Sequence, residues 1–222
     1  MSERIPAGVD LTALGSAPGG MALAEAVAGP PVCSAANPEG RELMKIYTRK
    51  GDDGTTGLLY GGRVRKDAPG PTAYGDVDEA QAAIGLARAH CPAGSELNDL
   101  LVALERDLWV LMADLATDGD NRHKLTAGTT LVTADMVARL ETLIDDYSER
   151  AEMPEEFVVP GEEPVSAFLD LARTVVRRAE RQSLAAIAEG SLALGYLNRL
   201  SDLLWTLARW QEGVSLTART PI

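Results

Sequence analysis

The sequence predicts an all-α protein, a five-helix up-and-down bundle that follows a glycine-rich N-terminal loop. Hydrophobic residues make up 45% of the 222 residues, enough for a sizeable buried core. Aromatic residues make up only 5%, and this alanine- and leucine-rich composition favours helices over sheets. Apolar residues recur at helical spacing in five stretches joined by short connections, so neighbouring helices can bury their apolar stripes against one another.

The predicted helices begin and end at residues that commonly mark helix ends. They occupy about residues 72–90, 95–117, 133 onward, 164–189 and 192–212. Ser95 and Thr133 suit the start of the second and third helices, because a hydroxyl can accept a hydrogen bond from a free amide of the first turn. Pro164 suits the first turn of the fourth helix. Gly190 and Gly213 are expected to follow the last two helices. The glycine-rich stretch of residues 45–71 is expected to be an ordered loop.

Residues 1–44 are predicted to be a disordered extension, and residues 45–222 to be one helical domain. The extension is rich in Ala, Gly and Pro and has no periodic apolar face. It lacks the apolar core of an export signal and the arginine-rich composition of a transit peptide. Composition changes abruptly at Met44, which is therefore a candidate native start.

Charge and cysteine content exclude several classes of protein. The formal net charge of −12 argues against a nucleic-acid-binding or anionic-membrane surface. Cys33 and Cys91 are far apart and lack the spacing of a metal site or a disulfide framework, which favours a reducing compartment. No apolar run approaches the roughly 20 residues of a membrane span. We therefore expect a cytoplasmic protein that binds neither nucleic acid nor membrane.

The segment TRKGDDGTTG, residues 48–57, is a candidate phosphate-binding loop. Its three glycines permit close approach of the backbone to a ligand. Its hydroxyl and cationic donors suit phosphate oxygens, and they are Thr48, Arg49, Lys50, Thr55 and Thr56. It is not a Walker A loop, because Gly57 is followed by Leu58, and an ordinary turn is the alternative. Lys66 either extends this loop or is a solvated lysine.

An arginine row is predicted on the fourth helix, in the segment ARTVVRRAERQ. At about 100° per residue, one face carries Arg173, Arg177, Glu180 and Arg181. The opposing apolar stripe consists of Leu171, Ala172, Val175, Val176 and Ala179. With Arg178, four arginines lie within nine residues of a strongly acidic chain, which favours a polyanionic ligand. A solvated helix face is the alternative.

Two further polar residues lie on predicted helices. Asn198, in YLNRLSDLLW, lies beside a leucine stripe and could bind a ligand or bridge two helices. Asp78, in YGDVDEAQAAIG, lies near small residues and could pair with an arginine or remain at the surface. Metal and serine-hydrolase chemistry find little support, because His90 and His123 have no ligand-spaced companions and no GxSxG segment is present.

In their order and spacing these segments resemble the PduO-type ATP:cob(I)alamin adenosyltransferases, also called corrinoid adenosyltransferases. The resemblance covers about residues 45–210 and rests on YTRKGDDGTTGLL, YGDVDE, MADLAT, FVVPG, ARTVVRRAER and YLNRLSDLLW. It implies a ferritin-like bundle that assembles as a homotrimer with active sites between subunits. It also implies transfer of the 5′-deoxyadenosyl group of ATP to cob(I)alamin, with release of inorganic triphosphate.

The resemblance further implies site residues. One subunit would bind ATP through Thr48, Arg49, Lys50, Gly51, Thr56, Gly57 and Lys66, and the next through Arg177, Arg178, Glu180, Arg181 and Asn198. The catalytic residues would be Arg177, Phe157, Asp78 and Arg173. The last three of these would also bind cobalamin. Asp78 and Arg173 resemble an intersubunit ion pair, worth about 3–5 kcal/mol if buried. Phe157 resembles an aromatic side chain beneath the corrin ring, with core packing as its alternative. Mg²⁺ would accompany ATP, and a corrinoid reductase and an adenosylcobalamin-dependent enzyme would be partners.

The sequence departs from the family pattern at a few positions near the expected cobalamin site. Ala80 and Gln81 stand where leucine and asparagine are usual, Glu162 and Glu163 follow Gly161, and Trp205 replaces a phenylalanine. Three other functions remain open: a non-catalytic cobalamin carrier or chaperone of the same fold, a kinase or nucleotidyltransferase with another acceptor, and a structural bundle with a solvated arginine row.

Overall fold

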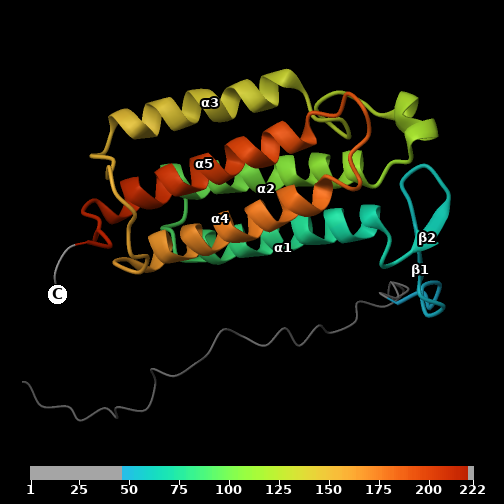
Figure 1. Cartoon of the computed structure of the whole chain (residues 1–222), viewed down its shortest axis with the longest axis horizontal. Helices are drawn as coiled ribbons and strands as arrows, with labels where there is room; N and C mark the ends of the chain where they lie inside the picture. Colours follow the sequence, from blue (N-terminus) through green and yellow to red (C-terminus); the bar gives the residue numbers. More distant parts are fainter. Residues whose placement is uncertain (1–46, 220–222) are drawn as a thin grey trace, which may run out of the picture. The chain divides into compact units, whose positions relative to one another are not determined.

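The computed structural model describes residues 47–219, which fold as a helical bundle with a small β-hairpin (Figure 1). Its elements are β1 (Thr55–Gly57), β2 (Arg63–Arg65), α1 (Pro69–Ala89), α2 (Glu96–Leu115), the 3₁₀ helix η1 (Gly119–Lys124), α3 (Ala134–Glu149), α4 (Pro164–Ser183) and α5 (Ala193–Glu212). The predicted all-α five-helix bundle is confirmed. The predicted extension at residues 1–44 lies outside the described residues. Within them, no helix combines the length and apolar character that a membrane crossing requires.

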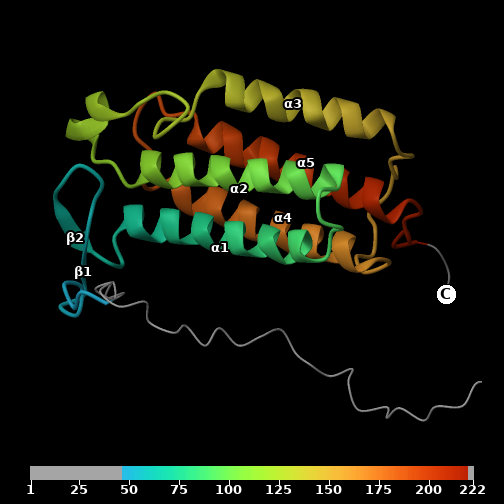
Figure 2. The ribbon, with the colours of Figure 1, turned by 180° about the vertical axis from the view of Figure 1, so that it is seen from behind.

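The helices pack side by side along the bundle (Figures 1 and 2). Helix α4 packs against both α1 and α5, α2 packs against α1, and α3 packs against α5. The core between them is mainly leucine and alanine, and the α5 side chains Leu197, Leu200, Leu204 and Leu207 are fully buried. The α4 stripe is buried as predicted except at Leu171, which is 46% exposed. Leu171 lies roughly 90° from the centre of that stripe, so it falls at its edge.

Most helix ends agree with the sequence, and two do not. Ser95 and Thr133 accept hydrogen bonds from the amides of Asn98 and Met136, as predicted. Helix α1 begins at Pro69, slightly before the predicted start, because proline fits a first turn that needs no amide donor. Helix α4 ends at Ser183, well before the predicted residue 189. The chain there turns toward α5, where the Ser191 hydroxyl donates to the buried Asp114 carboxylate at 3.1 Å.

The hairpin and η1 were not predicted. β1 and β2 pair antiparallel, with Thr55 opposite Arg65 and Gly57 opposite Arg63. The turn between them contains Gly61 and Gly62, both at positive φ, which glycine adopts without strain. Each strand has only three residues, too few to show a period-2 pattern. The expected ordered loop therefore includes a paired segment.

A polar cluster joins α2, α3 and α5 at one end of the bundle and predicts an acid-sensitive contribution to stability. Glu96 accepts hydrogen bonds from Arg150 and Tyr147, and these lower the pKa of Glu96 from 4.5 to about 2. The Arg150 guanidinium also lies 5.0 Å from the ring centre of Trp210. A carboxyl group with a lowered folded-state pKa stabilises the fold above its unfolded pKa, and that stability is lost as the pH falls from 4.5 through about 2.

We therefore expect Glu96→Gln to lower the melting temperature at pH 7 by roughly 2–4 °C, and by progressively less below pH 4.5. Thermal unfolding of both proteins across this range, followed by circular dichroism, measures the difference. A difference that stays constant from pH 7 to pH 3 would show that Glu96 contributes nothing through its charge.

Candidate active site

The glycine-rich loop before α1 brings Gly51 against Lys66. A β-carbon built at Gly51 would lie 3.1 Å from the Thr55 carbonyl oxygen and 3.2 Å from Lys66 Nζ. Any side chain at Gly51 would therefore press on the Thr55 backbone as well as on the lysine, and the fixed backbone contact favours glycine. The predicted loop residue Lys66 thus meets Gly51 in space, and its amide also donates to the Gly54 carbonyl at 2.9 Å.

Arg63 of β2 clamps the same loop, and sequence reasoning missed it. Its Nη2 donates to the Lys50 carbonyl at 2.6 Å and to the Thr55 hydroxyl at 2.6 Å. Asp53 accepts hydrogen bonds from the Thr55 amide and hydroxyl, and these bonds lower the Asp53 pKa. Only the hairpin pairing brings Arg63 opposite the loop, so no local sequence pattern could have identified it.

The remaining predicted loop residues lie on either side of this clamp. Thr48 Oγ1 accepts a hydrogen bond of 3.4 Å from the Lys50 amide. Arg49 has a φ of 60°, an uncommon conformation for a non-glycine residue, and lies 5.5 Å from the Tyr47 ring centre. Thr56 and Gly57 belong to β1, with Thr56 opposite Val64. The loop is therefore held from several sides, as a preformed binding loop should be.

The arginines of α4 have different environments. Arg178 forms ion pairs with Asp76 and Glu79 of α1, and the Glu79 hydrogen bond raises the pKa of Arg178. Arg181 Nη1 donates to the Arg177 carbonyl at 2.8 Å. Arg177 is exposed, and within residues 47–219 its guanidinium has no ion pair. Of these three, Arg177 has the guanidinium most available to a ligand.

Glu180 and Asn198 are brought together between α4 and α5. Asn198 Nδ2 donates to Glu180 Oε1 at 3.1 Å, and Asn198 Oδ1 accepts from Arg199 at 2.7 Å. This is the interhelical contact that sequence reasoning gave as an alternative to ligand binding. The bond fixes the amide beside the arginine face of α4, so the same geometry also suits a ligand.

Asp78 and Arg173 do not pair within one chain. Asp78 is exposed on α1. Arg173 Nε instead donates to Asp170 Oδ1 of its own helix at 3.0 Å. Because this bond uses only Nε, the two terminal nitrogens of the guanidinium fork remain for another partner.

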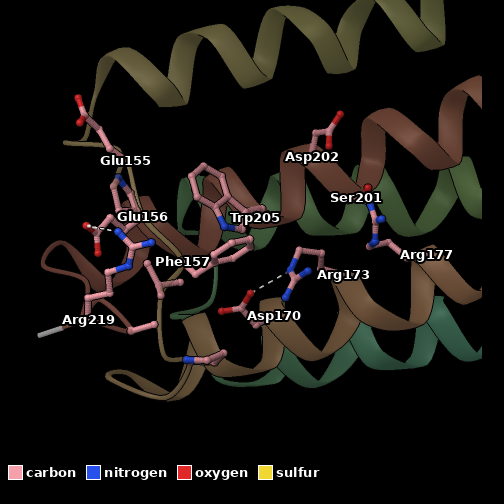
Figure 3. A pocket seen from close by; sticks show the side chains of 14 residues that line it. Glu155, Glu156, Phe157, Asp170, Arg173, Arg177, Ser201, Asp202, Trp205 and Arg219 are labelled. Atoms are coloured by element: carbon pink, nitrogen blue, oxygen red, sulfur yellow. Dashed lines mark hydrogen bonds and ion pairs between the residues drawn. The ribbon is translucent and has the colours of Figure 1, made fainter.

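A pocket of about 620 Å³ opens between the loop before α4 and the faces of α4 and α5 (Figure 3). Phe157 comes from the loop, Arg173 and Arg177 from α4, and Ser201 and Trp205 from α5. The pocket therefore combines aromatic surface with three arginines, the third being Arg219, which pairs with Glu156. Asp170, Asp202 and Glu155 also line it. Phe157 is 90% exposed, which excludes core packing as its role.

A family model described as cobalamin adenosyltransferase matches residues 46–211 of this sequence. The chain belongs to this family. The corrinoid adenosyltransferase of Mycobacterium tuberculosis is 42% identical over 190 residues, which cover 79% of this chain and 97% of that protein. The corrinoid adenosyltransferase of Bacillus subtilis is 38% identical over 75% of this chain and 86% of its own.

Solved structures of the cobalamin adenosyltransferase family also resemble this fold. A variant PduO-type ATP:corrinoid adenosyltransferase from Lactobacillus reuteri, complexed with cobalamin and ATP, is 28% identical and has a TM-score of 0.71. The match covers 79% of this chain and 97% of that one. A second variant of the same enzyme, complexed with ATP, has a TM-score of 0.69 at 28% identity.

In this member of the cobalamin adenosyltransferase family, a short antiparallel ladder positions Phe157. The Ala218 amide donates to the Phe157 carbonyl at 2.8 Å, and the Val159 amide donates to the Leu216 carbonyl at 2.8 Å. Val158 and Thr217 form the bridge between these bonds. The chain end that follows α5 therefore supports the aromatic wall of the pocket, and sequence reasoning missed this contact because it joins segments distant in sequence.

The glycine-rich loop and the loop of Phe157 lie at different ends of the molecule. The hairpin next to the glycine-rich loop lies at one end of the bundle, and the loop of Phe157 lies at the other (Figures 1 and 2). One chain therefore does not unite the loop and the pocket.

Within residues 47–219 no group of three or more His, Cys, Asp or Glu side chains is placed to hold a metal ion.

Proposed function

We propose that this protein is an ATP:cob(I)alamin adenosyltransferase, which transfers the 5′-deoxyadenosyl group of ATP to reduced cobalamin. The observation that carries the proposal is the pocket, in which Phe157 and Trp205 adjoin Arg173 and Arg177. A large planar ligand can lie on the aromatic side chains, while Arg177 meets a polyanion. Family membership and relatives named corrinoid adenosyltransferase agree with this reading.

The reaction requires alignment and charge stabilisation more than acid–base catalysis. The Co(I) electron pair attacks C5′ of ATP, the cobalt–carbon bond forms, and the C5′–O bond breaks with its electrons going to triphosphate. Co(I) is already a strong nucleophile, so no general base is needed. Guanidinium groups at the leaving group would stabilise its growing negative charge, and Arg177 forms no ion pair within the described residues.

Phe157 would act on the other face of the corrin ring. Reduction of Co(II) is easier when no lower ligand donates electrons to the metal. An aromatic side chain that fills the lower position excludes water and keeps cobalt four-coordinate. The exposed Phe157 side chain, fixed through its backbone to the chain end, suits this role.

We further propose that the active site forms between subunits of a homotrimer. The glycine-rich loop and the Phe157 pocket lie apart in one chain, and both carry groups that a complete site needs (Figure 1). The terminal nitrogens of Arg173 and the exposed carboxylate of Asp78 are available for a contact between chains.

Mg²⁺ would be held mainly by the triphosphate, because Mg²⁺ usually binds through substrate phosphates and one or two carboxylates. A cytoplasmic location, a corrinoid reductase and an adenosylcobalamin-dependent acceptor enzyme complete the proposal.

An anaerobic assay with ATP, cobalamin and a strong reductant tests the function. We expect the corrin spectrum to change to that of adenosylcobalamin, with one triphosphate released for each product formed. Release of ADP or pyrophosphate instead would indicate a kinase or nucleotidyltransferase. Binding of both substrates without either change would indicate a carrier and would refute the enzymatic proposal.

The proposed contact between Asp78 and Arg173 makes a prediction about assembly. Removing one partner of an isolated buried ion pair costs about 3–5 kcal/mol. Arg173 keeps Asp170 as a second partner, so the remaining guanidinium is not left unpaired. We therefore expect Asp78→Asn to weaken trimer assembly by only about 1–2 kcal/mol per interface. Sedimentation velocity across a concentration series measures this change. Asp99→Asn, on α2, is the control. If both variants assemble equally well, the proposed contact between Asp78 and Arg173 is refuted.

A further inference from the structure

Four charged side chains form a cluster beside the pocket: Asp170 and Arg173 on α4, and Arg209 and Glu212 on α5. Asp170 is 4% exposed and Arg209 is 1% exposed. The Glu212 side chain is 1% exposed, whereas that of Arg173 is 26% exposed. With two charges of each sign, the cluster is neutral as a whole. None of the sequence motifs predicted it.

Asp170 bridges the two arginines. Its Oδ1 accepts from Nε of Arg173 at 3.0 Å, and its Oδ2 accepts from Nη2 of Arg209 at 2.5 Å. Both carboxylate oxygens are thereby used, and the Nε edge of the Arg173 guanidinium is held toward Asp170. The direction in which Arg173 presents its terminal nitrogens to the pocket consequently depends on Asp170.

Arg209 connects the cluster to the aromatic walls of the pocket. Its guanidinium carbon lies 5.8 Å from the ring centre of Trp205. Its Nε lies 2.9 Å from Glu212 Oε1, and that oxygen accepts a bond of 2.5 Å from the Ser215 hydroxyl. Ser215 directly precedes the segment that pairs with the loop of Phe157. One buried side chain is therefore linked directly to Trp205 and, through Glu212 and Ser215, to the segment that holds Phe157.

We propose that Asp170 and Arg209 are positioning residues that set the relative placement of Arg173, Trp205 and Phe157 around the pocket. The proposal rests on the proposed function, because it concerns how that site is held. Stability alone explains the cluster poorly, since apolar residues of similar volume often stabilise a core as well as buried ions do. In addition, Arg209 Nη1 is buried and has no hydrogen-bond partner within the described residues, which costs free energy.

Two conservative variants test the proposal. Asp170→Asn keeps the shape but removes the charge that holds both arginines. Arg209→Lys keeps a charge but cannot form the forked contacts with Asp170 and Glu212. For each we expect the KM for cobalamin to rise about tenfold and the KM for ATP to change less than about twofold. We also expect faster hydrogen exchange at the Val159 and Ala218 amides.

Asp107→Asn is the matched control. Asp107 is also largely buried, and it accepts hydrogen bonds from Tyr196 and Arg139 away from the pocket. We expect this variant to lose stability without a change in the cobalamin KM or in exchange at Val159 and Ala218. An equal rise of the cobalamin KM in the control would mean that general destabilisation, and not positioning, is measured.

The outcomes separate this inference from the proposed function. An inactive wild-type protein would refute the proposed function. Hydrogen exchange at the Val159 and Ala218 amides would then be the sole test of the positioning role. Unchanged cobalamin KM and unchanged exchange in folded Asp170→Asn would overturn the inference while leaving the function intact. If neither conservative variant folds, Ser215→Ala cuts only the link from Glu212 to the chain end. We then expect faster exchange at Val159 and about a threefold rise of the cobalamin KM, and no change in either would overturn the inference.

Discussion

Arg177→Ala is expected to lower kcat/KM for adenosyl transfer by about 10²–10³-fold while leaving the fold intact. Removing one donor from a site that stabilises a developing anion costs about 2.7–4 kcal/mol of transition-state stabilisation. Arg177 lines the pocket and, within residues 47–219, has no ion pair that its loss would break. Exposed side chains of this kind contribute within about 0.5 kcal/mol to stability. Steady-state kinetics and thermal unfolding of the same preparation measure the two effects separately.

Arg88→Ala is a suitable control for Arg177→Ala. Arg88 lies on α1, is partly exposed, and pairs with Glu105 of α2. We expect this variant to keep the wild-type kcat, since Arg88 does not line the pocket. Arg177→Lys should recover part of the lost rate, because a lysine keeps the charge but loses the forked geometry. A rate of Arg177→Ala within about threefold of the wild type would contradict a role at the leaving group.

The helices could be predicted from the sequence because their signals are local. The Ser95 and Thr133 caps, the proline in the first turn of α4 and the glycine after α5 each depend on neighbouring residues only. The end of α4 depends instead on a distant contact. The chain leaves the helix although the segment that follows is rich in helix-forming alanine, and Ser191 in that connection bonds to Asp114, which lies far away in sequence.

The same distinction applies to the site. Glycine spacing and the density of arginines indicated a loop and a cationic helix face, since both are properties of short segments. The clamp by Arg63, the ladder that holds Phe157 and the Asp170–Arg209 pair join residues that are far apart in sequence. Their roles are set by tertiary structure, which residue type and spacing alone do not reveal. The contact between Asp78 and Arg173 stays a prediction, because it requires a second chain.

Phe157→Ala is expected to abolish the four-coordinate Co(II) signal and to lower the rate of adenosylation from cob(II)alamin by about 10²-fold. The side chain is 90% exposed, so its removal leaves no cavity in the core and stability should change by less than about 0.5 kcal/mol. The backbone bonds of residue 157 to Ala218 do not involve the ring and should remain. Electron paramagnetic resonance of cob(II)alamin bound with ATP measures the coordination state directly.

Two comparisons separate this role from a general loss of binding. The Kd for ATP should stay within about twofold of the wild type, because the phenyl ring carries no charge or hydrogen-bond donor for the triphosphate and its removal leaves the pocket arginines in place. With cob(I)alamin reduced beforehand, Phe157→Ala should recover to within about tenfold of the wild type, since the hindered step has then been bypassed. Leu184→Ala, which removes another exposed side chain just after α4, should leave both the signal and the rate unchanged. A Phe157→Ala protein that retains the four-coordinate signal would show that Phe157 does not exclude the lower ligand, and Trp205 would then be the aromatic residue to test.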